Sequence, residues 1–258
     1  WYPVDVSTSA QATLGGMAGN NSCGSRSIAY GNMVHNVLAT KVWTSDGALH
    51  DFGSFDQATG TALTLGQKVR DLALALRPEI EQHWPKVMRR VGGYNLDIFH
   101  NQSERPYTND GAVNLAHLLV GSEGTLALTR SLTLKLAELP RAKVLGVVNF
   151  PTFYKAMDSA QHIVKLGADG TLSAVELVDR TMIELALQNP AFAPTVRTAL
   201  SPKINQGKPD AILLVEFSGA SKADITPKIR QLVELMGDLG LPGSVVEMID
   251  DAPQKNLW

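Results

Sequence analysis

The chain has 258 residues, of which 44% are hydrophobic and 19% are charged, and its formal net charge is -2. This composition is typical of a globular protein, with enough chain for one large domain or two small ones. The near-neutral charge and the absence of a dense run of Lys and Arg argue against a nucleic-acid partner. The short basic cluster of Lys86, Arg89 and Arg90 is expected to be the solvated end of a helix.

Cysteine content, hydropathy and histidine spacing bear on disulfides, membrane segments and metal sites. The single cysteine, Cys23, excludes a disulfide within the chain and fits a reducing cytoplasm. No stretch approaches the roughly 20 apolar residues that a membrane-spanning helix needs. The six histidines lack metal-ligand spacing, so no metal site is expected. Neither WYPVD at the start nor QKNLW at the end is typical of a natural terminus, and both ends are expected to be cuts.

The first part of the chain is rich in loops. Residues 13–32 combine many Gly, Asn and Ser without a helical period, so no packed helix is expected there. Two β-prone stretches, 34–45 and 48–52, flank an Asp-Gly turn and predict a hairpin.

Helical spacing appears next. Residues 66–90 carry apolar side chains at helical intervals, and Pro78 and Pro85 are expected to divide them into two shorter helices. The alternation of Leu with polar residues over 126–136 then predicts a strand.

After Pro140 a pattern of strand, helix and strand occurs twice. The two copies are similar in sequence: VVNF and SAVELVD in the first correspond to LVEF and SVVEMID in the second. Such an internal β-α-β repeat favours a split β-α-β sheet with its helices on one face, and it sets the domain boundary near Pro140. The expected strands are 144–150, 174–178, 211–217 and 244–249, and the expected helices are 152–166 and 222–239.

Two segments have the composition of a ligand-binding surface. In ATLGGMAGNNSCGSRSIAYG, residues 12–31, the glycines leave backbone N–H groups accessible to a large polar ligand. In VGSEGTLALT, residues 120–129, a loop followed by a strand offers N–H and C=O groups to a heterocycle. Taken singly, the two segments are explained as well by a structural Gly-rich loop and a capped turn.

Taken in this order, the two segments resemble the vanillyl-alcohol-oxidase / p-cresol-methylhydroxylase (PCMH) family of flavoproteins. The similarity is greatest to its glycolate-oxidase and D-lactate-dehydrogenase-like branch. The segment KVMRRVGGYNLDIF, residues 86–99, is similar to larger members that also contain a cysteine-rich iron–sulfur part. The resemblance implies an α+β fold. Residues 1–140 would be the C-terminal part of a PCMH-type FAD-binding domain, and 141–258 a truncated ferredoxin-like FAD-linked oxidase cap domain with an antiparallel sheet.

The same resemblance implies an FAD-dependent oxidoreductase acting on CH–OH. The intact parent would oxidise a small 2-hydroxy acid of the D-lactate, glycolate or 2-hydroxyglutarate type by hydride transfer to flavin, and an electron acceptor would reoxidise it. A cytoplasmic location is expected, and peripheral association with a membrane is left open. The alternative is a non-catalytic small-molecule-sensing or interaction module built on the two β-α-β repeats.

Matching positions transfer FAD contacts to this chain, whereas no residue is singled out as catalytic. The family's Gly-rich pyrophosphate loop would lie before Trp1, and a substrate-binding Arg and a His-rich segment would follow Trp258. The isolated chain is therefore expected to bind FAD weakly and to be inactive. The implied FAD contacts are Ser9, Ala12, Thr13, Gly16, Asn20, Asn21, Ser22, Cys23, Gly24, Glu123, Gly124, Thr125, Leu128 and Thr129.

Overall fold

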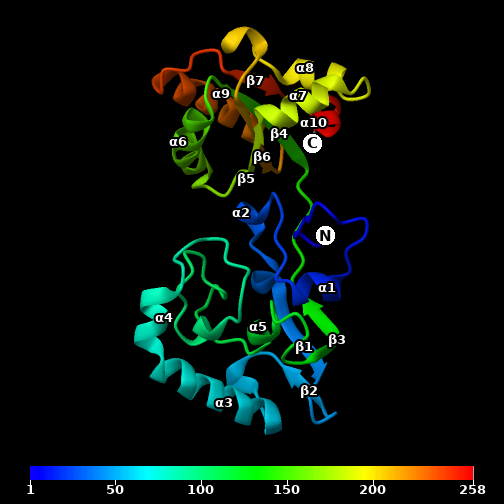
Figure 1. The fold of residues 1–258 in the computed structure, drawn as a ribbon, viewed down its shortest axis with the longest axis vertical. Coiled ribbons are helices and arrows are strands. Elements are labelled where there is room, and N and C mark those ends of the chain that lie inside the picture. Colours follow the sequence, from blue (N-terminus) through cyan, green and yellow to red (C-terminus); the bar gives the residue numbers. More distant parts are fainter. Residues whose placement is uncertain (258) are drawn as a thin grey trace. The chain divides into compact units, whose positions relative to one another are not determined.

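A computed structural model describes residues 1–257 of the chain, and the chain forms two compact units (Figure 1). The first unit is Trp1–Glu138, and the second begins at Leu139. Both units combine helices with an antiparallel sheet, which confirms the α+β class. No helix within the described residues is long and apolar enough to cross a membrane.

The sheet of the first unit has three antiparallel strands in the order β2-β1-β3. They are β1 (Val37–Trp43), β2 (Leu49–Phe52) and β3 (Leu128–Leu134). The predicted hairpin joins β1 to β2, and Gly47 in its turn has a φ of +78°. A φ in this region is adopted without strain by glycine, which explains the Asp-Gly pair at this point.

The helices of the first unit are short, apart from one. They are α1 (Leu14–Gly19), α2 (Ser27–Tyr30), α3 (Gly60–Ala75), α4 (Arg77–His83) and α5 (Ala116–Leu119), with 3₁₀ turns η1 (Met33–Asn36), η2 (Phe55–Gln57) and η3 (Leu96–Phe99). Pro78 lies in the first turn of α4, where its missing N–H costs little, so the division into two helices is confirmed. The boundaries differ from the expected ones, because α3 begins earlier and α4 ends at His83.

The expectation that residues 13–32 contain no packed helix is wrong. The Thr13 side chain accepts a hydrogen bond from Gly16 N–H and caps α1, and Met17 and Ala18 are buried. A helix this short is stabilised by its cap and by packing rather than by a long apolar period. In the sequence, the available sign of this helix was therefore the capping residue Thr13 followed by the apolar pair Met17 and Ala18.

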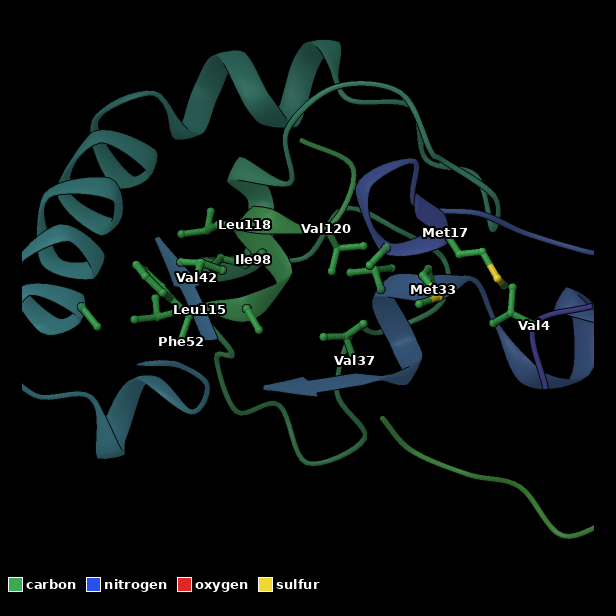
Figure 2. Packing of buried hydrophobic residues seen from close by; sticks show 14 residues of the cluster. Val4, Met17, Met33, Val37, Val42, Phe52, Ile98, Leu115, Leu118 and Val120 are labelled. Atoms are coloured by element: carbon green, nitrogen blue, oxygen red, sulfur yellow. The ribbon is translucent and has the colours of Figure 1, made fainter. Parts of the chain in front are cut away.

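A hydrophobic core cluster holds much of the first unit together. Figure 2 shows Met17 of α1, Met33 and Val37 near the start of β1, and Leu115 and Val120 around α5 in one cluster. Complete burial of such side chains contributes roughly 1.5–3 kcal/mol each. Met17 belongs to the Gly-rich segment and Val120 to the later one, so the core fixes both segments in the same unit.

The sheet of the second unit has four antiparallel strands in the order β5-β6-β4-β7. They are β4 (Ala142–Phe150), β5 (Leu172–Asp179), β6 (Ala211–Gly219) and β7 (Val245–Met248). The two repeats contribute one central and one edge strand each, as in a ferredoxin-like fold. The predicted single antiparallel sheet is confirmed.

The sheet of the second unit is covered on both faces, whereas helices were expected on one. A Cβ at Gly146 would lie 2.5 Å from Leu232 of α9, so α9 covers that face of β4. Leu145 and Val147 point to the opposite face because side chains alternate along a strand, and they pack with Ile183 of α7. Figure 1 shows α6 and α9 on one side and α7, α8 and α10 on the other. The bounds are α6 (Phe153–Ile163), α7 (Arg180–Gln188), α8 (Ala193–Ala199), α9 (Lys222–Asp238) and α10 (Asp251–Leu257), with 3₁₀ turns η4 (Val164–Gly167) and η5 (Asn205–Gly207).

Candidate flavin-binding site

The two Gly-rich segments, far apart in the sequence, are hydrogen-bonded to each other. Gly121 N–H donates to Ala18 O at 2.9 Å, and Glu123 N–H donates to Gly19 O at 3.0 Å. The contact is close, since a Cβ at Gly121 would lie 3.2 Å from the Cβ of Asn21. The end of α1 and the loop before β3 therefore form one continuous backbone surface.

Asn21 holds this surface in place from inside. Its φ of +48° is in the left-handed region, where Asn is one of the few tolerated side chains. Its Oδ1 accepts from Val34 N–H at 3.0 Å, its Nδ2 donates to Arg90 O at 3.4 Å, and the residue is 1% exposed. The Asn21 side chain is thus hydrogen-bonded to the protein through both its oxygen and its nitrogen.

The outward side of the surface is open main chain. A Cβ at Gly15 or Gly124 would meet no atom within 4 Å, and Gly124 has a φ of +78°. Glycines without a neighbour in front of them let a large ligand lie close against the backbone, so the residues present fit FAD. Ser9, Thr13, Gly16, Asn20, Glu123, Gly124, Thr125, Leu128 and Thr129 are exposed, Ala12, Cys23 and Gly24 are half-buried, and Asn21 and Ser22 are buried.

Gly24 has a different reason to be glycine. A Cβ there would lie 2.3 Å from the backbone oxygen of Asp5. The Asp5 carboxylate accepts from Ser25 Oγ–H at 2.8 Å and forms an ion pair with Arg26 at 2.8 Å. The Asp5 loop therefore closes this end of the Gly-rich segment, and close protein packing accounts for Gly24.

A third segment, residues 89–95, borders the same surface and was not assigned to it from the sequence. Arg89 Nη2 donates to Gly24 O at 2.8 Å, and the hydroxyls of Tyr94 and Thr125 are 2.8 Å apart. Asn95 Nδ2 donates to Val120 O at 3.0 Å. The available signal was the sequence GGYN at residues 92–95, close to the basic pair Arg89 and Arg90. This pattern specifies no contact by itself.

The expectation that Arg90 is solvated is wrong. Helix α4 ends at His83, and the Arg90 side chain is 9% exposed in an ion pair of 2.7 Å with Asp97, which is fully buried. Tyr107 also donates to Asp97 at 3.0 Å, and burial followed by the Asp97 charge raises the pKa of Tyr107. The charges of Arg90 and Asp97 neutralise each other beneath the backbone surface that residues 12–31 and 120–129 form, which we call the motif surface. Sequence reasoning missed it because its members meet only in the folded chain.

Two histidines flank the Tyr107 ring, with ring centroids 5.9 Å (His35) and 6.0 Å (His117) away. His35 Nδ1 accepts from Asn32 N–H at 3.1 Å, and His117 Nε2 lies 3.1 Å from Val37 O. Burial lowers the pKa of each imidazole to about 4. Both are therefore neutral near pH 7, and their hydrogen bonds fix the backbone that leads from the Gly-rich segment into β1.

Family comparisons place these elements in a known context. Residues 1–53 match a family described as FAD binding domain, and residues 139–258 match FAD linked oxidases, C-terminal domain. The chain belongs to the FAD-linked oxidases. The resemblance drawn from the two segments is confirmed, and with it FAD as the cofactor of the family.

Curated relatives of this FAD-linked oxidase chain are 2-hydroxy acid dehydrogenases. It is 31% identical to the D-2-hydroxyglutarate dehydrogenase of Pantoea ananatis, over 90% of the chain and 22% of that protein. It is 26% identical to the Haemophilus influenzae enzyme of the same name, over 92% of the chain and 23% of that protein. It is 27% identical to the probable mitochondrial D-lactate dehydrogenase of Danio rerio, over 100% of the chain and 39% of that protein. The chain therefore spans between about a fifth and two-fifths of these relatives.

Solved structures agree on the fold. The FAD-linked oxidase chain superposes on alkyldihydroxyacetonephosphate synthase with a TM-score of 0.57 and 17% identity, covering 95% of this chain and 34% of that one. At this level of identity the likeness concerns the fold alone.

Proposed function

We propose that the protein containing this chain is an FAD-dependent dehydrogenase or oxidase of a small 2-hydroxy acid. D-2-hydroxyglutarate and D-lactate are the substrates named for its relatives. In this proposal residues 1–140 are the C-terminal part of the FAD-binding domain. Residues 141–258 are the cap that shapes the substrate side.

One observation carries the proposal: the two Gly-rich segments form a single open backbone surface. The hydrogen bonds Gly121 to Ala18 and Glu123 to Gly19 join them, while Gly15 and Gly124 face empty space. A purely structural role would need the joining hydrogen bonds and the left-handed backbone of Gly124, but it gives no reason for the open glycine at position 15. The matches to an FAD binding domain and to FAD linked oxidases disfavour the sensing-module alternative.

Residues of this chain would bind and orient the cofactor through main chain and short polar side chains. FAD, when bound, supplies the ring that accepts hydride from the substrate. The Gly124 region offers a backbone that a planar group approaches closely, and Thr125 is positioned by its contact with Tyr94. The residues proposed to hold FAD are Ser9, Ala12, Thr13, Gly16, Asn20, Asn21, Ser22, Cys23, Gly24, Glu123, Gly124, Thr125, Leu128 and Thr129.

The wider setting is part of the same proposal. A separate electron acceptor reoxidises the flavin, an iron–sulfur part resides elsewhere in the parent, and the enzyme works in the cytoplasm, either free or at a membrane surface. Support comes from the similarity to the large bacterial D-2-hydroxyglutarate dehydrogenases, of which this chain covers 22–23%.

The decisive experiment compares two glycines with the same φ in the full-length protein. Gly124 and Gly47 both have a φ of +78° and open space around a Cβ. Valine at either position imposes the same left-handed strain, roughly 1–2 kcal/mol. We expect Gly124→Val to lower the flavin-to-protein absorbance ratio at least several-fold and Gly47→Val to leave it unchanged.

The control separates strain from contact. Because Gly47 lies in the β1–β2 turn and is not one of the residues proposed to hold FAD, its variant reports the cost of strain. Full flavin occupancy in Gly124→Val, or equal losses in the two variants, would contradict the proposed cofactor surface.

A further inference from the structure

One feature of the first unit that FAD binding does not explain is an apolar cavity of about 590 Å³. It lies between α3 and the segment that follows α4. Val69, Leu72, Leu118 and Leu126 supply apolar walls, and Trp84 and Tyr94 supply aromatic ones. Cavities that hold small organic ligands span roughly 300–1,000 Å³, so the size fits a molecule of two or three rings.

Two hydrogen-bond donors at this cavity have no acceptor. Trp84 Nε1–H and Arg90 Nε–H are buried without a partner among residues 1–257, and both residues line the cavity. Buried donors are almost always satisfied in native proteins, so each such orphan calls for an explanation. Arg90 is 9% exposed, which places one orphan on a side chain held firmly in the protein interior.

The orphans specify what a ligand must offer. Among the described side chains that line the cavity, the unpaired buried polar atoms are these two donors. A ligand that pairs with them therefore presents acceptor oxygens. Its charge is constrained as well, because Asp97 already neutralises Arg90 at 2.7 Å. An anionic ligand would lose its water in an apolar cavity without meeting a free positive charge.

We propose that this cavity is a binding site for an uncharged aromatic or quinonoid molecule with ring carbonyl oxygens. The ring packs against Leu72, Leu126 and Trp84, and its oxygens accept from Trp84 Nε1–H and Arg90 Nε–H after a small opening of the covering side chains. Tyr94, which lines the cavity, contacts Thr125 through its hydroxyl. The ligand thus contacts the side chain of Leu126, which belongs to the second segment of the FAD surface, and does not lie on the open backbone of Gly124.

The test titrates the 258-residue chain with 2,3-dimethyl-1,4-naphthoquinone by isothermal calorimetry. Both reactive ring positions of this probe are blocked, so addition of the Cys23 thiol does not compete with binding. The hydrocarbon 2,3-dimethylnaphthalene has the same rings without the oxygens. We expect the quinone to bind at one site with at least about tenfold higher affinity than the hydrocarbon, since it satisfies two donors.

Two variants locate the site. Trp84→Phe keeps an aromatic ring and removes the donor, and it should weaken quinone binding about 3- to 10-fold while leaving hydrocarbon binding unchanged. Trp43→Phe is the matched control, because Trp43 lies on β1 outside the cavity, and it should change neither affinity. Circular dichroism verifies that each variant is folded.

Three results would overturn the proposal. The first is equal affinity for the quinone and the hydrocarbon, which would leave the donors without a role. The second is an unchanged quinone affinity in Trp84→Phe. The third is displacement of the quinone by FAD in competition, which would make the cavity a part of the cofactor site. The last outcome leaves the proposed FAD function intact, whereas loss of flavin in Gly124→Val bears only on that function.

Discussion

At the scale of single residues, the buried pair of Arg90 and Asp97 is the most sensitive point below the motif surface. Asp97→Ala would leave the Arg90 guanidinium buried without its counter-charge, which typically costs about 3–5 kcal/mol. Asp71→Ala is the matched control, because its ion pair with Arg70 is exposed and contributes about 0–1 kcal/mol. Urea unfolding of the chain measures both free energies. Similar losses in the two variants would show that Arg90 is solvated after all.

His35 and His117 predict an acid-sensitive first unit. Burial lowers the pKa of each to about 4, against an ordinary value of about 6.5. Below pH 6.5 the histidines of the unfolded chain bind protons, whereas those of the folded chain stay neutral until about pH 4. The contribution of the two histidines to the free energy of unfolding is therefore complete above pH 6.5 and is lost progressively down to about pH 4. Urea midpoints measured from pH 7.5 to 4.5 test this. His117→Gln should flatten the curve, and an equally steep curve in the variant would exclude His117 as a source.

The residue scale also shows what the sequence foretold of the site. Exposure of the Gly124 loop followed from its glycines, since glycine with short polar neighbours favours open backbone. The inward orientation of Asn21 did not follow, because its partners, Val34 N–H and Arg90 O, come together only in the fold. Nor did the burial of Arg90, since a basic pair reads as solvated until Asp97 and Tyr107 are placed beside it.

At the scale of elements, the packing of α9 on β4 depends on the absence of one side chain. A Cβ at Gly146 would lie 2.5 Å from Leu232 Cδ2, so Gly146→Ala forces the leucine aside at a cost of about 1–3 kcal/mol. Leu232→Ala alone leaves a cavity and costs about 2–5 kcal/mol. Combined, the two should cost clearly less than their sum, because the shortened side chain no longer clashes. Additive losses in chemical denaturation would mean that Gly146 and Leu232 are not in contact.

Elements also differ in how far the sequence foretold them. The strands of the second unit were predicted because their apolar runs are continuous, and β4 is buried over nearly its whole length, as a strand covered on both faces must be. That same continuity was the available sign of a second helical layer. Helices α7 and α8 were missed because they are short and depend on a few contacts such as Ile183 and Ala199 against the sheet, which no periodicity displays.

At the scale of the whole molecule, each unit has its own core, and we expect each to unfold as its own cooperative block. Leu115 is fully buried in the first unit, and Gly146 lies against α9 in the second. Leu115→Ala should therefore cost about 2–5 kcal/mol in one calorimetric transition, and Gly146→Ala should lower only the other. A single transition that moves equally with both substitutions would show that the two cores unfold together.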